Sequence, residues 1–153
     1  MILEETTIHG CFVIDIEPSS DERGFFARSF CREEFEARGL NPHIEQCGVS
    51  MNPKRGTLRG MHYQVAPHAE CKLVRCMNGA AFDIALDLRS DSPAFGKWHG
   101  VELNAANHRS HYIPEGVAHG FITLADDTEL LYQTSAAHHP GCARGIRWND
   151  PAF

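Results

Sequence analysis

The chain has 153 residues, a length that fits one domain with a core of its own. Apolar residues make up 42% and charged residues 22%, as in soluble globular proteins, and no apolar run is long enough to span a membrane. The net charge of −6 argues against a nucleic-acid-binding surface, and the lack of a secretory signal favours a cytoplasmic protein whose six cysteines are free thiols.

Short apolar runs separated by glycine and proline predict a succession of strands. The predicted strands cover residues 11–17, 57–64, 71–77, 80–88, 98–103, 111–113, 119–124 and 129–134. Residues 31–38 predict one short helix that ends at Gly39. Many short strands with one helix indicate an all-β sandwich or barrel, and we expect a single domain over residues 1–153.

Alternation along residues 80–88 divides the predicted strand into two faces. One face carries Phe82, Ile84, Leu86 and Leu88, and the other carries Ala81, Asp83, Ala85 and Asp87. The face with Asp83 is either a solvated outer face or the lining of a polar pocket. Lys72 shares a face with apolar side chains, so it is either an edge residue whose ammonium reaches solvent or a pocket residue.

Two segments carry the residues best suited to chemistry, at positions 56–64 and 112–121. The second contains Pro114-x-Gly116-x-x-His119, which resembles the second motif of cupin barrels. The first stands where a cupin has His-x-His followed by a glutamate, but it has the sequence His62-Tyr63-Gln64. A cupin metal site uses about three histidines and a carboxylate. We therefore expect a cupin barrel that has lost its metal site.

Motifs along nearly the whole chain resemble the dTDP-4-dehydrorhamnose 3,5-epimerase family. They are Asp-Glu-Arg-Gly-Phe-Phe at 21–26, Arg-Gly-Met-His-Tyr-Gln at 59–64, Lys-Leu-Val-Arg at 72–75, Asp83, Asp-Leu-Arg-Ser-Asp-Ser-Pro at 87–93, Phe-Gly at 95–96, Ile-Pro-Glu-Gly-Val-Ala-His-Gly-Phe at 113–121, Tyr132 and Trp-Asn-Asp-Pro at 148–151. The resemblance implies a cupin-type double-stranded β-helix, or jelly roll, with one short helix. It also implies a homodimeric epimerase that inverts C3, C5 or both of a nucleotide-diphosphate-linked 4-keto-6-deoxy sugar.

The resemblance implies a catalytic role for four residues of this chain. His62 is expected to be the general base, Lys72 to hold the C4 oxygen of the sugar, and Tyr132 to be the acid on the opposite face. Asp83 is expected to lie near His62 and to support its charge. A ketone at C4 acidifies the protons on C3 and C5, so neither a metal nor another cofactor is expected. A base that works near pH 7 and a group that stabilises the oxyanion are sufficient.

The same resemblance implies a set of substrate-binding residues. They are Arg23, Phe26, Arg28, Gln46, Arg59, His119 and His138. Arg23 and Arg59 are expected on the diphosphate, because a guanidinium makes paired charge-assisted hydrogen bonds. Strict alternation places Arg59 and His62 on opposite faces of one strand, so they share a pocket only if a bulge, which Gly60 could allow, bends the strand or if Arg59 reaches round its edge.

Several positions on the nucleotide side depart from the family pattern. Arg28 and Ala143 each replace a glutamate, Gly48 replaces an asparagine, and residues 136–139 replace a pair of aromatics. His138 is the candidate that would take over stacking on the base. These changes predict weaker selectivity for dTDP, with CDP or GDP carriers or a differently shaped sugar as the substrate. In the alternative interpretation, recognition of the base is loose and His138 simply takes over the stacking.

Two other functions remain open from the sequence alone. One is a metal-dependent cupin oxygenase or isomerase, whose ligands would be His62, Gln64, Glu70 and His119. The other is a non-catalytic jelly roll that binds sugar nucleotides, because the chain ends at Phe153 where the family continues into a segment that brings further charged residues to the site. Exchange of substrate protons with solvent distinguishes an enzyme from a binding protein.

Overall fold

A computed structural model describes residues 1–152. The strands are β1 (Ile2–Glu5), β2 (Phe12–Asp15), β3 (Ser19–Asp21), β4 (Gly24–Phe26), β5 (Gln46–Asn52), β6 (Leu58–Gln64), β7 (Lys72–Asn78), β8 (Ala80–Asp87), β9 (Trp98–Asn104), β10 (Ser110–Ile113), β11 (Val117–Thr123), β12 (Thr128–Thr134) and β13 (Ala143–Gly145), and the helix is α1 (Arg32–Glu36). All eight predicted strands and the predicted helix are confirmed, with ends shifted by at most two residues. The single domain over residues 1–153 stays a prediction, and its last residue, Phe153, lies outside the described residues.

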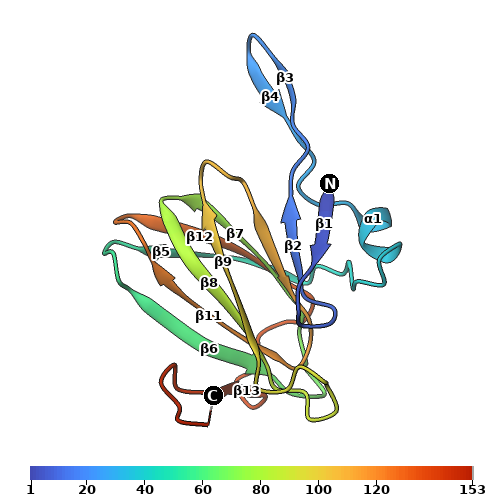
Figure 1. Cartoon of the computed structure of the whole chain (residues 1–153), viewed down its shortest axis with the longest axis vertical. Helices are drawn as coiled ribbons and strands as arrows, with labels where there is room; N and C mark the ends of the chain where they lie inside the picture. The colour runs from blue at the N-terminus through green and yellow to red at the C-terminus, as the bar shows by residue number, and fades with distance from the viewer. Residues whose placement is uncertain (153) are drawn as a thin grey trace.

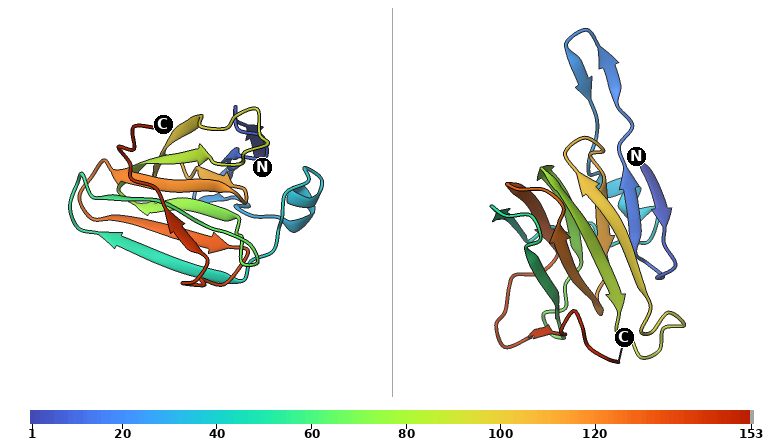
Figure 2. Two further views of the ribbon diagram at one scale, coloured as in Figure 1. Left: turned by 90° about the horizontal axis from the view of Figure 1, so that it is seen from below. Right: turned by 60° about the vertical axis from the view of Figure 1, so that its left-hand side comes forward.

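The strands form two antiparallel sheets that lie face to face, and β3 and β4 form a separate hairpin (Figures 1 and 2). The larger sheet has the order β1-β2-β10-β7-β12-β5, and the smaller has the order β13-β6-β11-β8-β9. Neighbours such as β2 and β10, or β6 and β11, are far apart along the chain, which is the connectivity of a jelly roll. The predicted cupin-type jelly roll is thereby confirmed.

The apolar core lies between the two sheets and takes side chains from both. Its buried members include Val74 of β7, Leu103 of β9 and Leu130 of β12. A second apolar cluster covers the outer face of the larger sheet, where Phe35 of α1 packs edge-on against Tyr112 of β10 with 5.6 Å between ring centroids. The inner faces of the two sheets therefore supply the core, and any site between the sheets must be built from the inward-facing residues beside it.

Helix α1 is five residues long and has Glu33 and Glu34 in its first turn, where the helix dipole favours acidic side chains. The chain leaves the helix at Gly39, whose φ of 72° favours glycine.

In residues 1–152, no helix is long and apolar enough to cross a membrane. All six cysteines, which lie in this range, are free thiols, as the sequence predicts.

Strand β8 has the predicted alternation, but its acidic face points inward. Asp83 and Asp87 are fully buried between the sheets, whereas Ile84 lies on the outer face. The solvated-face interpretation of Asp83 is therefore wrong. Burial is tolerated because each carboxylate has charged partners. Asp87 pairs with Nη2 of Arg89 at 2.7 Å, and Asp83 pairs with two histidines described below.

The β3–β4 hairpin extends away from the two sheets at one end of the molecule (Figures 1 and 2). All six residues of its strands are exposed, and Phe26 retains 80% of its accessible surface. An aromatic ring in such an exposed position contributes little to the fold of its own chain, because burial of apolar surface is what stabilises a fold. The hairpin is thus a candidate contact element.

Candidate active site

A cavity of about 570 Å³ lies between the sheets and is lined by residues of both. Its walls are formed by Ser50, Leu58, Arg59, Gly60, His62, Lys72, His119, Phe121 and Tyr132. Three of the four predicted catalytic residues, His62, Lys72 and Tyr132, are brought together here, with the predicted binding residues Arg59 and His119. The motifs from distant parts of the chain therefore meet in one place.

His62 lies on β6 directly opposite His119 of β11. The pKa of His62 is lowered, first by partial burial and then by the positive charges of Lys72 and His119. At neutral pH its imidazole is consequently uncharged and has a free lone pair. This is the protonation state that a general base requires.

A bulge in β6 places Arg59 and His62 in the same cavity, which is one of the two arrangements that the sequence left open. His62 pairs with His119 and Arg59 pairs with Phe121, so β6 has one residue more than β11 over this stretch. Gly60 lies in the bulge with a φ of 127°, and a Cβ there would collide with Cα of Gly120. Only glycine therefore fits at this position.

The ammonium of Lys72 is almost buried and is held by a carboxylate. Its Nζ lies 2.7 Å from Oε1 of Glu70, and both side chains are about nine-tenths buried. The same Nζ lies 3.5 Å from the carbonyl oxygen of His62. A charged donor is thus positioned beside the base, in a site with little water to screen it. The interpretation of Lys72 as a pocket residue is confirmed, and the solvent-reaching alternative is wrong.

Tyr132 lies on β12 in the larger sheet, whereas His62 lies on β6 in the smaller sheet. A ligand between the sheets would therefore meet these two groups from opposite sides. Burial raises the pKa of Tyr132 well above its usual range, and the nearby Asp83 carboxylate raises it further. The phenol remains protonated at neutral pH and can donate a proton.

Asp83 is bonded to two other histidines, one of which, His119, lies opposite His62, so support of His62 by Asp83 stays a prediction. Its Oδ2 lies 2.7 Å from Nε2 of His119, and its Oδ1 lies 2.8 Å from Nδ1 of His111. The Nε2 of His111 in turn lies 3.2 Å from Sγ of Cys11. Asp83 lies on the inner face of β8, beside β11 in its own sheet and across from β10 in the facing sheet. Its partners are therefore His119 of β11 and His111 of β10.

The two histidines keep the buried carboxylate of Asp83 ionised although burial opposes its charge. Burial alone would raise the pKa of Asp83, but the charge of His119 and hydrogen bonds from both histidines hold it below its usual range. Burial likewise opposes a charge on His111, yet hydrogen bonds to Asp83 and Cys11 raise its pKa to about 10. No motif in the sequence singles out His111. Its position at the start of a predicted apolar strand was the available signal.

A second cavity of about 490 Å³ adjoins the first, and the two share Tyr132. It is lined by Gln46, Cys47, Gly48, Val49, Glu70, Tyr132, Thr134 and His138. The predicted binding residues Gln46 and His138 meet here, where Oε1 of Gln46 accepts a hydrogen bond from the backbone N–H of His138 at 2.8 Å. Together the two cavities offer an elongated site.

Arg23, Phe26 and Arg28 do not reach either cavity of their own chain. Arg23 and Phe26 lie on the projecting hairpin, where Arg23 pairs with Asp21. The guanidinium of Arg28 pairs with Glu34 at 2.9 Å. The hairpin carries Arg23 and Phe26 away from the sheets (Figure 1), and the substrate-binding role of these three residues stays a prediction.

Two residues of the alternative cupin metal site, Gln64 and Glu70, are engaged in other contacts. The amide nitrogen of Gln64 donates to the carbonyl oxygens of His68 and Ala137 at 2.9 and 3.2 Å, and its oxygen accepts from the N–H of His139 at 2.6 Å. Glu70 is committed to Lys72. A bound amide and a paired carboxylate are poor substitutes for the ligands that a cupin metal requires.

Comparisons with known proteins agree with this geometry. A family model described as dTDP-4-dehydrorhamnose 3,5-epimerase matches residues 5–153. The dTDP-4-dehydrorhamnose 3,5-epimerase of Shigella flexneri is 46% identical over 150 residues, which cover 97% of this chain and 82% of that protein. The crystal structure of the corresponding enzyme from Elizabethkingia anophelis has a TM-score of 0.96 at 36% identity and covers 100% of this chain and 84% of its own. A Legionella pneumophila epimerase in complex with dTDP-4-keto-L-rhamnose has a TM-score of 0.90 at 36% identity, with 99% of this chain and 80% of that chain covered.

The Asp83→Asn variant should be strongly destabilised, because it leaves the buried His111 without its carboxylate. Breaking a buried pair costs about 3–5 kcal/mol of unfolding free energy. Urea unfolding at pH 7 measures this loss, and the exposed Asp91→Asn serves as a control that should change stability by less than about 0.5 kcal/mol.

The contact between Asp83 and His111 should also make the stability of the fold depend on pH. The contribution of Asp83 is complete above its unfolded pKa of 3.8 and is lost as the pH falls, because its folded pKa is lower. The contribution of His111 is complete below its unfolded pKa of 6.5 and is lost as the pH rises toward about 10. The difference in unfolding free energy between the wild type and Asp83→Asn should therefore become smaller at both low and high pH. A constant difference would contradict this assignment.

Proposed function

This chain belongs to the dTDP-4-dehydrorhamnose 3,5-epimerase family, and from that premise we propose how its cavity inverts a nucleotide-linked 4-keto-6-deoxy sugar. The protein is a nucleotide-sugar epimerase. The observation that carries the proposed mechanism is the meeting of three groups in one cavity: an uncharged imidazole, a buried ammonium and a protonated phenol. Base and acid come from different sheets, as inversion at carbon requires.

The reaction begins with removal of the proton on the carbon next to the C4 ketone. Nε2 or Nδ1 of His62 takes this proton, and the electron pair of the C–H bond moves into the C4 carbonyl to form an enolate. Lys72 donates a hydrogen bond to the C4 oxygen as negative charge develops on it, which lowers the barrier electrostatically. Tyr132 then delivers a proton to the other face of the carbon, and the inverted ketone forms. Exchange with solvent returns His62 and Tyr132 to their starting states.

Arg59 and His119 complete the cavity on the side of β6 and β11. The Nε of Arg59 donates to Oδ1 of the buried Asn52 at 2.8 Å, so the guanidinium is oriented before a diphosphate arrives. Asp83 holds His119 in turn and acts as a positioning residue, since it touches His119 and His111 and does not line the cavity.

A His62→Ala variant should lose exchange of substrate protons with D2O at every exchanging carbon, because the other imidazole of the cavity, His119, is engaged by Asp83 through its Nε2. Tyr132→Phe should still permit exchange but should block completed inversion where Tyr132 is the acid. Each group should contribute about 10²–10⁴-fold to the rate. NMR of a 4-keto sugar nucleotide in D2O measures both effects, with the exposed His9→Gln as a control.

Because the pKa of His62 is lowered, kcat/KM should remain level from neutral pH to below 6.5 and fall only at more acidic pH.

Near-normal exchange by His62→Ala would refute the assignment of the base. A protein that binds the sugar nucleotide but catalyses no exchange would be a non-catalytic binding protein instead.

We further propose that the active form is a homodimer in which the β3–β4 hairpin of one chain reaches the pocket of its partner. Arg23 and Phe26 are expected to bind substrate, yet both are exposed on the hairpin and do not line the cavity of their own chain. This difference supports the proposal. A second copy resolves this contrast, since it buries the exposed rings and brings a cation to the diphosphate. The free thiols support a reducing compartment, which we take to be the cytoplasm.

An Arg23→Ala variant should raise KM by roughly 10–100-fold, the equivalent of a charge-assisted hydrogen bond of about 1.5–3 kcal/mol. Co-expression with His62→Ala chains tests where the hairpin acts. In a mixed dimer, the Arg23→Ala chain keeps an intact pocket and receives an intact hairpin from its partner. About a quarter of the pockets should then be active in an equal mixture. The exposed Arg32→Ala is the matched control, and failure of the mixture to recover activity would contradict the proposal.

For the nucleotide, we propose a weaker preference for dTDP than the family pattern implies. The second cavity has Gly48 in its wall, and a Cβ at this glycine would meet no atom within 4 Å. The wall is therefore open where the family has an asparagine side chain. A site discriminates strongly only where its polar groups would be left unpaired by the wrong ligand.

Calorimetry with dTDP, CDP and GDP should show a preference for dTDP of less than tenfold, or about 1.4 kcal/mol. Gly48→Asn should increase that preference, because the cavity has room for the added amide. A preference of tenfold or more in the wild type would refute the proposal and would leave the epimerase assignment intact.

A further inference from the structure

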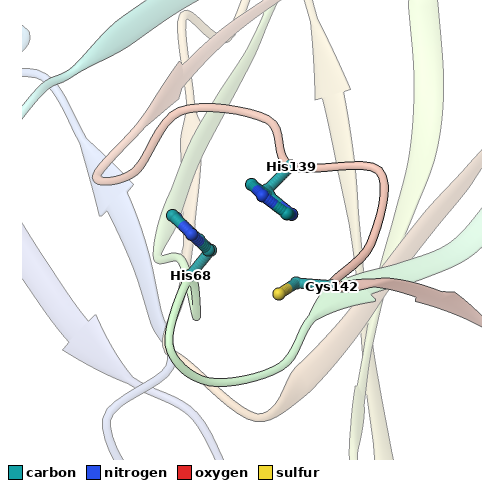
Figure 3. A group of neighbouring side chains, drawn as sticks. All are labelled: His68, His139 and Cys142. Carbon is teal, nitrogen blue, oxygen red and sulfur yellow. The ribbon is translucent and has the colours of Figure 1, made fainter.

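Three side chains with metal-binding atoms gather outside the active site. His68 comes from the segment between β6 and β7, and His139 and Cys142 come from the segment between β12 and β13 (Figure 3). One donor atom from each lies within 4.8 Å of the other two. No other group of three such residues with this spacing occurs within residues 1–152.

We propose that His68, His139 and Cys142 bind one thiophilic divalent metal ion, with Zn²⁺ as the best match. Two imidazole nitrogens and one thiolate form a donor set that zinc accepts in tetrahedral geometry, with a fourth position left for water. The set contains no carboxylate, so Ca²⁺ and Mg²⁺ are poor candidates. Cys142 is 8% exposed and His139 is exposed, so the thiolate is sheltered while the ion has a path from solvent.

The backbone around these ligands is already held in place. The N–H of Cys142 donates to the carbonyl oxygen of His139 at 2.9 Å, which forms a turn that brings these two residues together. Gln64 joins the two segments, since its amide binds the carbonyl oxygen of His68 and the N–H of His139. Fixing the ligand backbones beforehand lowers the conformational cost of binding an ion.

The side chains must rotate before they can bind. The rings of His68 and His139 are stacked, with 4.2 Å between centroids and 7° between planes (Figure 3). A ring nitrogen presents its lone pair in the ring plane, so the parallel rings must tilt to point at one ion. Gly141 leaves the required space, because a Cβ there would come within 3.3 Å of Nδ1 of His139. Exposure of His139 makes this rotation inexpensive.

A bound ion would tie together the two segments beside the second cavity. One segment carries Glu70, which holds Lys72, and the other carries His138. We therefore expect the ion to stabilise the folded chain and to slow backbone motion in both segments. The chemistry at His62 uses none of these ligands, so binding of the ion and epimerase activity are separate measurements.

The test uses metal-free protein titrated with Zn²⁺ by calorimetry and with Co²⁺ by absorption spectroscopy. We expect one ion per chain and a thiolate-to-cobalt charge-transfer band that disappears in Cys142→Ser. Loss of a group that merely orients a metal ligand costs ~10–100-fold in affinity, so His139→Gln, which removes a ligand, should weaken Zn²⁺ binding by at least that much. The controls Cys31→Ser and His9→Gln should bind as the wild type does.

Hydrogen exchange provides an independent measurement. Zn²⁺ should slow amide exchange in residues 65–71 and 135–142 of the wild type and raise its thermal midpoint. Neither effect should occur in His139→Gln, whose exposed side chain leaves the metal-free fold intact. Absence of the charge-transfer band in the wild type would overturn the proposal. Binding that survives both Cys142→Ser and His139→Gln would overturn it as well.

Discussion

The buried carboxylate of Asp83 is the interaction on which the rest of the structure depends. It contacts His119 in its own sheet and His111 in the facing sheet, so one charge connects the two layers of the sandwich. Burying an unpaired carboxylate would be prohibitive, but two imidazoles compensate its charge. The same charge fixes the ring of His119 in the cavity and helps to keep Tyr132 protonated. Asp83 therefore contributes both to the stability of the fold and to the delivery of a proton by Tyr132.

The arrangement of charge in the cavity separates the tasks of its residues. Lys72 has its ammonium held by Glu70, and its positive charge helps to keep the nearby His62 neutral. Tyr132, on the opposite sheet, is shielded from solvent and close to negative charge, so it holds its proton. Base and acid thus differ in protonation state because their surroundings differ, which is how one cavity provides both functions at a single pH.

Local sequence patterns predicted the strands well, because alternation and turn residues act over a few positions. They missed β5, whose residues are mostly exposed and include a glycine, and the short strands β1, β3, β4 and β13. Alternation also separated the two faces of β8 correctly but could not say which one faces inward. That choice depends on His111 and His119, which lie 28 and 36 residues away in the chain. Motif resemblance gathered the cavity residues correctly, but it could not show that Arg23 projects away from its own pocket.

Gln64 makes a cupin-type metal site hard to build at this position of β6. Its amide anchors two loops through the carbonyl oxygens of His68 and Ala137 and the N–H of His139. A histidine at this position would forfeit those bonds at once, and each buried group left unpaired costs about 1–3 kcal/mol. An evolutionary route to metal chemistry at this position would thus pass through a less stable intermediate before any ion was gained. Selection for folding alone is enough to oppose that route, whatever advantage the metal chemistry offered at its end.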